Sequence, residues 1–246
     1  MAGYSKRMLA IFDRLESVAY SQARHIFPIS HYVKENLINH YGIPPQKITV
    51  VGTGLGVIKP FYGTKDYCNK KILYVAKGRL QDKGGELAME SFRRALELDP
   101  QLQLTIVGSE EANKYRENRN VTVLGFVSLQ ELQELFDSHS LFLMPALNEP
   151  WGLVYLEAMA CKMPIMGLNR NGFPELSGDG KYGFAIQELD PDVLCHALVN
   201  AFRSPERLCE MGEHAQRNCL REYSWENTVT RMLAAIEGDT SSCVNS

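Results

Sequence analysis

Hydrophobic residues along this chain follow two spacings in turn, one typical of strands and one typical of helices. Short apolar runs of strand length recur at 71–76, 102–107, 121–124, 141–144 and 164–167. Apolar residues at helical spacing predict helices between and after these runs, at 85–98, 129–138, 153–161 and 191–203, with one more from 205 and a last from 225 to about 238. This order predicts an α/β fold with a doubly wound, Rossmann-like parallel sheet, whose ligands bind at the carboxyl ends of the strands.

The two ends of the chain have other patterns. Near the start we expect a helix at 4–22, a strand at 26–29 and a helix at 31–41 that begins after the N-cap candidate Ser30. The last residues, 239–246, are polar, and we expect them to form a frayed tail.

Two glutamates bracket the predicted start of the helix at 153–161. Glu149 lies on a turn marked by proline and glycine, and Glu157 lies about one helical turn inside the helix. Free backbone N–H groups and the positive end of the helix dipole favour a phosphate at this point. A nucleotide-sugar, with hydroxyls at both ends and phosphate between them, fits this pattern. The alternative is that Glu149 caps the helix and Glu157 is solvated.

A basic, glycine-rich loop at 77–85 follows the first predicted strand of the sheet. Arg79 offers a planar fork to two phosphate oxygens, and Lys83 supplies a mobile charge, so the two are suited to a diphosphate. Gly78 lets the backbone approach a ligand closely. The alternative is a solvated basic loop without a ligand.

Together these stretches resemble the family-4 (group 1) retaining glycosyltransferases of the GT-B fold. Three further segments fit in the same order along the chain. Residues 26–43 are similar to the end of the family's N-terminal domain, 47–55 to its interdomain crossing, and 163–175 to the strand and Gly-x-Pro-Glu loop after the glutamates. The resemblance therefore implies that 1–50 are a remnant of the N-terminal domain with the crossing, and that 51–238 form the nucleotide-sugar-binding domain.

The resemblance also implies a role for each matching residue. In the family, the positions matching Arg79 and Lys83 hold the donor diphosphate, the one matching Glu157 binds the ribose hydroxyls, and the one matching Glu149 orients the transferred sugar. The family usually spaces the two cations wider than this chain does. The residues whose backbone is expected to lie against the donor are Trp151, Gly152, Leu153, Gly78, Gly125, Phe126 and Val127.

The function implied by the resemblance is transfer of a hexose from a UDP-, GDP- or ADP-sugar to an unidentified acceptor, with retention at the anomeric carbon. Arg79, Lys83 and helix amides would neutralise the leaving group, so no metal or other cofactor is expected. A second copy of the chain, or a separate chain with the N-terminal domain, is the expected protein partner. The alternative is a non-catalytic nucleotide-sugar-binding or assembly module.

Charge and composition bear on the partners and the compartment of the protein. The net charge is −3 with dispersed positive residues, so we expect no nucleic-acid partner. No apolar run reaches the ~20 residues of a spanning helix, and the N-terminus lacks a signal-peptide pattern, so we expect a cytoplasmic protein. The ordinary apolar period at 4–22 favours packing on its own domain over membrane contact.

Other enzyme classes fit less well. A glycosidase acid and nucleophile pair at Glu149 and Glu157 would leave Arg79 and Lys83 without a role. A nicotinamide-dependent enzyme would need a Gly-x-Gly-x-x-Gly turn after a strand, and this chain has none.

Overall fold

The structure, a computed structural model, describes residues 4–243 and divides the chain into two compact units. Residues 55–224 form the larger unit, and the residues up to 54 group with those from 225 onward. This division differs from the expected domains, 1–50 and 51–238, because the last helix belongs to the smaller unit. That helix continues to Cys243, beyond its expected end near Gly238, and the rest of the expected tail, 244–246, lies outside the described residues.

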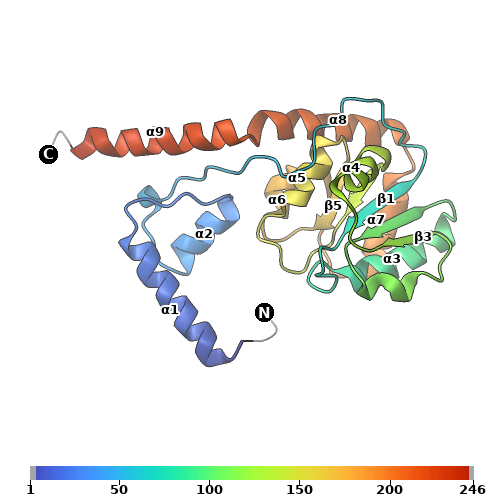
Figure 1. The fold of residues 1–246 in the computed structure, drawn as a ribbon, viewed down its shortest axis with the longest axis horizontal. Helices are drawn as coiled ribbons and strands as arrows, with labels where there is room; N and C mark the ends of the chain where they lie inside the picture. Colours follow the sequence, from blue (N-terminus) through green and yellow to red (C-terminus); the bar gives the residue numbers. More distant parts are fainter. Residues whose placement is uncertain (1–3, 244–246) are drawn as a thin grey trace. The chain divides into compact units, whose positions relative to one another are not determined.

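A six-stranded parallel sheet forms the centre of the larger unit (Figure 1). Its strands in spatial order are β3 (Val121–Leu124), β2 (Gln103–Val107), β1 (Lys71–Val75), β4 (Leu141–Leu143), β5 (Ile165–Leu168) and β6 (Gly183–Ile186). The first strand, β1, lies in the middle of the sheet, and β2 and β3 follow outward on one side. The chain then returns to place β4 beside β1, and β5 and β6 follow outward on the other side. The doubly wound parallel sheet predicted from the sequence is therefore confirmed.

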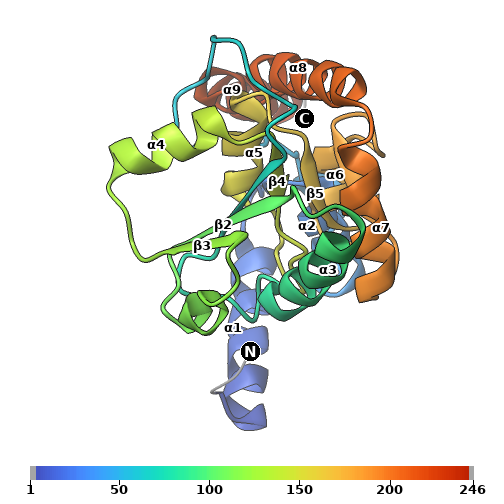
Figure 2. The same cartoon turned by 90° about the vertical axis from the view of Figure 1, so that its right-hand side faces the viewer.

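Helices cover both faces of this sheet (Figure 2). The helical elements of the larger unit are α3 (Gly85–Leu98), η2 (Glu111–Tyr115), α4 (Leu129–Ser138), α5 (Leu153–Ala160), α6 (Phe173–Ser177), α7 (Pro191–Ala201) and α8 (Pro205–Glu222). On one face, α3 packs along α7. On the other, the ring of Phe142 in β4 contacts Phe136 of α4 and Tyr155 of α5. Because both faces are covered, the strands read as nearly continuous apolar runs.

Several helices begin at residues whose capping role is visible in the sequence. Ser128 and Glu131 form the reciprocal bonds of a capping box at α4, and the Asp190 side chain accepts a hydrogen bond from the amide of Asp192 at the start of α7. Strand β6 and helix α6 were not predicted. Each has only four or five residues, too few to show a period.

The smaller unit contains α1 (Lys6–Gln22), α2 (His31–Asn39), the 3-10 turn η1 (Pro45–Lys47) and α9 (Trp225–Cys243). Ser30 caps α2 as predicted, since its hydroxyl accepts from the Val33 amide at 3.1 Å. The predicted strand at 26–29 is wrong: a single parallel bridge joins Ile26 to Ile48. The Val51 amide also donates to the Pro28 carbonyl oxygen at 3.0 Å, but Pro28 has no amide hydrogen with which to extend the ladder. Among the described residues, no helix is long and apolar enough to cross a membrane.

The C-terminal end of α4 is held by two buried side chains. The ammonium of Lys65 donates to the carbonyl oxygens of Phe136, Asp137 and His139 at 2.7–2.9 Å, which satisfies carbonyls that the helix leaves unpaired. The Nδ1 atom of His139 lies 2.7 Å from the carbonyl oxygen of Leu135, so this nitrogen carries the proton and donates. The other ring nitrogen, Nε2, therefore accepts from the Thr105 hydroxyl at 2.8 Å, which ties α4 to β2.

We predict that His139 makes the protein less stable in acid. Burial is the main cause that lowers its pKa from 6.5 to about 4, and the charges of Lys71 and Lys65 lower it further. The unfolded chain therefore takes up a proton as the pH falls from 6.5 towards 4, while the folded protein does not. Between pH 7 and pH 4.5 this difference removes about 2 kcal/mol of the free energy of unfolding.

Urea unfolding at both pH values tests this expectation. His139→Gln should show a smaller loss between pH 7 and pH 4.5 than the wild type. The exposed His214→Gln variant is the control and should keep the wild-type loss. An equal loss in both variants would contradict the assignment of this acid sensitivity to His139.

Candidate functional site

The carboxyl ends of β1 and β4 mark the point where the strand order reverses. The two strands are neighbours, but their connections leave in opposite directions, which opens a crevice for ligands in folds of this kind. The loop after β1, 76–84, meets the loop after β4, 144–152, at this crevice. Their backbones touch, since the Leu147 amide donates to the Asp82 carbonyl oxygen at 2.9 Å.

Gly84 makes this close approach possible. Its φ is 72°, in the left-handed region, and a Cβ at this position would lie 1.9 Å from the carbonyl oxygen of Pro145. Any side chain would therefore both strain the backbone and push the two loops apart.

An ion pair between Lys83 and Glu149 joins the same two loops. The Nζ atom of Lys83 contacts Oε2 of Glu149, and the two side chains are 8% and 16% exposed, respectively. The structure thus brings together two of the residues predicted for the site. A Cβ on Gly152 would lie 3.1 Å from Cγ of Glu149, which places this side chain at the start of α5. Burial raises the pKa of the Tyr155 phenol, and the charge of Glu149 raises it further.

The N-terminus of α5 has no side-chain cap. Its N-cap is Gly152 with a φ of 84°, so Glu149 does not cap the helix as the simpler interpretation required. Trp151 is buried and packs edge-on against Tyr223, with 5.6 Å between ring centroids, while Leu153 is 40% exposed at the first helical position. The turn is therefore anchored by the Trp151 ring, and its backbone lies at the crevice.

Arg79 belongs to the same loop as Lys83 but is exposed. Its side chain is 53% exposed, and its Nε donates to Oδ2 of Asp82 at 3.1 Å. No hydrogen bond or ion pair within the described part of the chain joins Arg79 to Glu149 or Glu157. An ion pair this exposed contributes little, so an anionic ligand can recruit the guanidinium at small cost.

Glu157 is buried, so the alternative interpretation, in which it is solvated, is wrong. It is only 2% exposed, and Oε1 accepts a hydrogen bond from the amide of Val57 at 2.9 Å. A Cβ on Gly56 would lie 2.1 Å from Oε1, so only glycine allows this contact. The carboxylate thus fastens the segment around Gly56 and Val57 to α5.

The second oxygen of Glu157 has a different environment. Every fully buried polar side-chain atom in the described residues has a hydrogen-bond partner, and Oε2 accepts no hydrogen bond from them. This oxygen therefore retains some accessible surface. One oxygen of Glu157 is structural, and the other can accept from a ligand.

The loop after β3, whose backbone is expected to lie against the donor, lies beside the loop after β1. Gly78 donates its amide to the carbonyl oxygen of Gly108 at 2.6 Å, at the carboxyl ends of β1 and β2. The ring of Phe126 is 77% exposed, and it is the side chain nearest to the position that a Cβ would take on either glycine, at 4.0 Å for Gly78 and 3.9 Å for Gly108. Gly125 and Val127 flank this ring in the loop after β3. The ends of three strands thus present backbone and one aromatic ring at a single edge.

Three residues of this region were not predicted. Gly56 and Val57 hold Glu157 from a distance of a hundred positions along the chain, and no local pattern signals such a contact. Gly108 follows the strand run at 102–107 directly, and a glycine at the carboxyl end of a parallel strand was a signal for close backbone approach.

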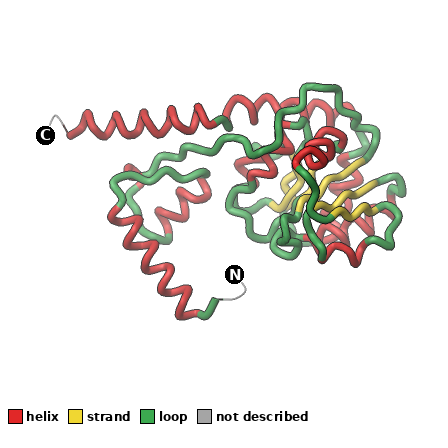
Figure 3. Tube along the Cα trace, in the orientation of Figure 1, coloured by secondary structure: helices red, strands yellow, loops and turns green. Residues whose placement is uncertain are grey.

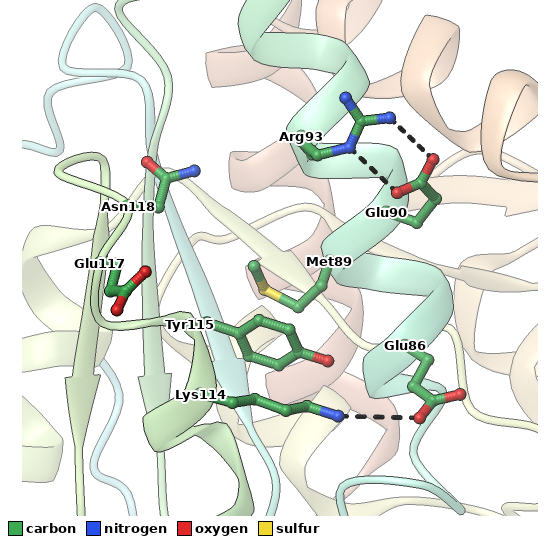
Figure 4. A pocket seen from close by; sticks show the side chains of 8 residues that line it. All are labelled: Glu86, Met89, Glu90, Arg93, Lys114, Tyr115, Glu117 and Asn118. Carbon is green, nitrogen blue, oxygen red and sulfur yellow. Dashed lines mark hydrogen bonds and ion pairs between the residues drawn. The ribbon is translucent and has the colours of Figure 1, made fainter.

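A separate cavity of about 370 Å³ lies between α3 and the segment around η2 (Figure 4). Met89 and Tyr115 lie at its centre, and its cations pair with its own carboxylates: Lys114 with Glu86 at 3.7 Å, and Arg93 with Glu90 at 3.0 Å. None of the predicted donor-binding residues lines it. Among the described residues, no group of three or more His, Cys, Asp or Glu side chains could hold a metal ion.

The fold and the loops at the strand-order reversal define a Rossmann-like domain of the kind that binds nucleotides. The sequence profile of the family "Glycosyl transferases group 1" matches residues 64–218, and that of "Glycosyltransferase Family 4" matches residues 1–56. The chain therefore belongs to the group 1 glycosyltransferases, in agreement with the resemblance seen in the motifs.

Relatives and solved structures agree with this family. D-inositol 3-phosphate glycosyltransferase of Thermobifida fusca (strain YX) is 27% identical over 84% of this chain and 53% of its own length. A TarM variant of S. aureus, crystallised with fondaparinux, alpha-GlcNAc-glycerol and UDP, matches with a TM-score of 0.78 at 16% identity, covering 91% of this chain and 46% of TarM. Anabaena Alr3699/HepE with UDP and glucose matches with a TM-score of 0.74 at 18% identity, covering 97% and 68%. The two structures show a common fold, and this chain spans about half the length of the curated relatives it matches.

We predict that Gly84→Ala lowers the free energy of unfolding by about 2 kcal/mol or more, because alanine is strained at positive φ and its methyl group meets the Pro145 carbonyl. Gly125→Ala is the control. Its Cβ would meet nothing within 4 Å, so we expect a change within about 0.5 kcal/mol. Denaturant unfolding measures both, and wild-type stability in Gly84→Ala would show that the two loops need not touch.

Proposed function

We propose that this chain is the donor-binding part of a glycosyltransferase that transfers a hexose from a nucleotide-diphosphate sugar to an acceptor, with retention at the anomeric carbon. One observation carries the proposal: Lys83 and Glu149 form a shielded ion pair across the two loops at the strand-order reversal. Family membership supports it, and the neighbours crystallised with UDP make UDP-sugars the first donors to test.

The ion pair suits a ligand that offers both a negative charge and hydroxyl donors. A partly buried lysine or carboxylate that loses its partner is costly, so a ligand that separates the two must satisfy each. A diphosphate gives Lys83 a new anion, and a sugar hydroxyl gives Glu149 a donor. In this proposal, Glu149 orients the sugar ring, and Lys83 stabilises the negative charge that develops on the leaving phosphate.

Arg79 and the start of α5 neutralise the diphosphate charge that Lys83 does not. Arg79 moves from Asp82 to the phosphate oxygens, where its planar fork makes two bonds at once. The uncapped N-terminus of α5 adds backbone amides and the helix dipole. With three sources of positive charge, the proposed reaction uses no metal ion.

The nucleoside lies, in this proposal, between Glu157 and the edge formed by Gly78, Gly108 and Phe126. The Oε2 atom of Glu157 accepts from a ribose hydroxyl while Oε1 keeps the Val57 amide. Backbone groups of 125–127 contact the base. Because these contacts come from the main chain, they select the base by its hydrogen-bonding edge.

The second candidate is a non-catalytic nucleotide-sugar-binding or assembly module. The observation that favours it is coverage, since this chain spans about half the length of the relatives it matches. The two functions differ in turnover: both bind a nucleotide-sugar, but only the transferase breaks the bond between sugar and phosphate.

Binding of UDP tests the assigned contacts. We expect Arg79→Ala and Glu157→Gln each to weaken UDP about tenfold, because each removes one charge-assisted bond to the ligand. Glu157→Gln preserves the size of the side chain and an oxygen for the Val57 amide, so the fold should be retained. Isothermal titration measures affinity, and circular dichroism checks the fold.

Arg93→Ala is the matched control, since it removes an exposed arginine of α3 that pairs with glutamates of the same helix. A thermal-shift series with UDP, GDP and ADP identifies the base. Wild-type affinity of both site variants for all three nucleotides would refute the assignment of this site.

Release of UDP from a UDP-sugar separates the two candidate functions. We expect Glu149→Gln to lower this turnover roughly 100-fold, because the sugar is no longer held in its reacting position. Binding of UDP alone should not weaken, since the substitution frees Lys83 for the diphosphate. Turnover by the wild type in EDTA is also expected. Binding without any wild-type turnover of the sugars tested would favour the module.

A further inference from the structure

A second groove lies at the opposite end of the same sheet, between its amino-terminal edge and the end of α4. Its volume is about 560 Å³, within the range of small-molecule sites. Lys71, Gln103 and Thr105 share one face of β1 and β2, because Lys71 is in register with Gln103. The bond from Thr105 to His139 shows that α4 covers this face. The lining is completed by Pro100, Arg119, Asn120, Thr122, Leu135 and Ser138.

The charges of this groove are unbalanced. Among the side chains that the structure describes, it is lined by two cations, Lys71 and Arg119, and by no Asp or Glu. Within the described part of the chain, neither cation forms an ion pair or a side-chain hydrogen bond. The 370 Å³ cavity on the other face is different, since the ion pairs of its own lining occupy both of its cations.

The two cations are near enough to share one anion. Leu104 pairs with Val121 in register, so Gln103 lies beside Asn120 and Arg119 comes one residue earlier. Lys71 and Arg119 are thus about two strand spacings apart, roughly 10 Å at the backbone. Both side chains are long and flexible, and each extends over several ångströms, so their charged ends can converge on one phosphate.

The neutral polar groups of the groove have mostly used their donors. The Thr105 hydroxyl donates to His139, and the Ser138 hydroxyl donates to the carbonyl oxygen of Glu134 at 2.7 Å. The amide of Asn120 donates to the carbonyl oxygens of Pro100 and Leu102 at 3.0 and 2.8 Å. What these three side chains still offer is acceptor oxygens, and acceptor oxygens bind hydroxyl groups.

We propose that this groove binds a small phosphorylated polyhydroxyl compound, such as a sugar phosphate. Lys71 and Arg119 hold the phosphate, and the oxygens of Thr105, Ser138 and Asn120 accept from the hydroxyls. The site is separate from the proposed donor site, which lies at the carboxyl ends of the strands, about 13 Å or more away along β1. Its occupant therefore contacts none of the loops that would hold the donor.

Titration of the full chain with glucose 6-phosphate, glucose and inorganic phosphate tests this inference, with isothermal titration calorimetry as the readout. We expect glucose 6-phosphate to bind more tightly than either of the others, because it alone supplies both the anion and the hydroxyls. Lys71→Gln and Arg119→Gln should each weaken its binding by roughly tenfold. Lys114→Gln, on the other face of the sheet, is the matched control and should bind as the wild type does.

Affinity for UDP should be the same in Lys71→Gln, Arg119→Gln and the wild type, which separates this site from the proposed donor site. Chemical-shift changes on adding glucose 6-phosphate should concentrate at Thr105, Thr122 and Ser138. The proposal is overturned if the wild type does not bind glucose 6-phosphate, if both substitutions leave its affinity unchanged, or if inorganic phosphate binds equally well.

Discussion

The reversal of strand order between β1 and β4 places two loops against each other, and one ion pair with little access to solvent joins them. Lys83 and Glu149 must satisfy each other there, because either charge alone would lose solvation without compensation. Gly84 removes the side chain that would otherwise separate the loops. The crevice therefore has a defined chemical requirement: a ligand that enters must replace both partners at once. A nucleotide-diphosphate sugar carries both an anion and hydroxyl donors, so in the proposed function it meets this requirement.

In the proposed function, Glu157 serves the fold and a ligand together. Its Oε1 atom fastens the segment at Gly56 and Val57, while Oε2 retains accessible surface. A carboxylate has enough acceptor capacity for both tasks, whereas alanine would remove both. Loss of binding in a truncated variant would thus not by itself identify a ligand contact. The conservative amide distinguishes the roles, because it keeps an oxygen for Val57 but cannot serve two donors equally well.

Much of the larger unit could be predicted because its signals are local. The limits of α3, β3 and α4 match the apolar periods, and the capping box at Ser128 fixed the start of α4. Predictions failed where contacts between residues far apart in the sequence determine the structure. The run at 26–29 has the composition of a strand but forms a single bridge, at Ile48, because Pro28 cannot donate to a ladder. The burial of Glu157 depends on Val57, a hundred positions earlier, and the spacing of the two glutamates contains no information about it.

The two ends of the sheet use positive charge in opposite ways. At the carboxyl end, Lys83 and Arg79 each have a carboxylate partner, so an anion binds only by exchange. Exchange lowers affinity for any simple anion and favours a ligand that also satisfies the displaced carboxylates, which is a source of specificity. At the amino-terminal edge, Lys71 and Arg119 have no carboxylate partner among the described residues, so the proposed anion would displace no protein group there. Inorganic phosphate should therefore enter the amino-terminal groove more easily than the crevice. Selectivity of the groove for one phosphate compound over another must then come from the acceptor oxygens around it.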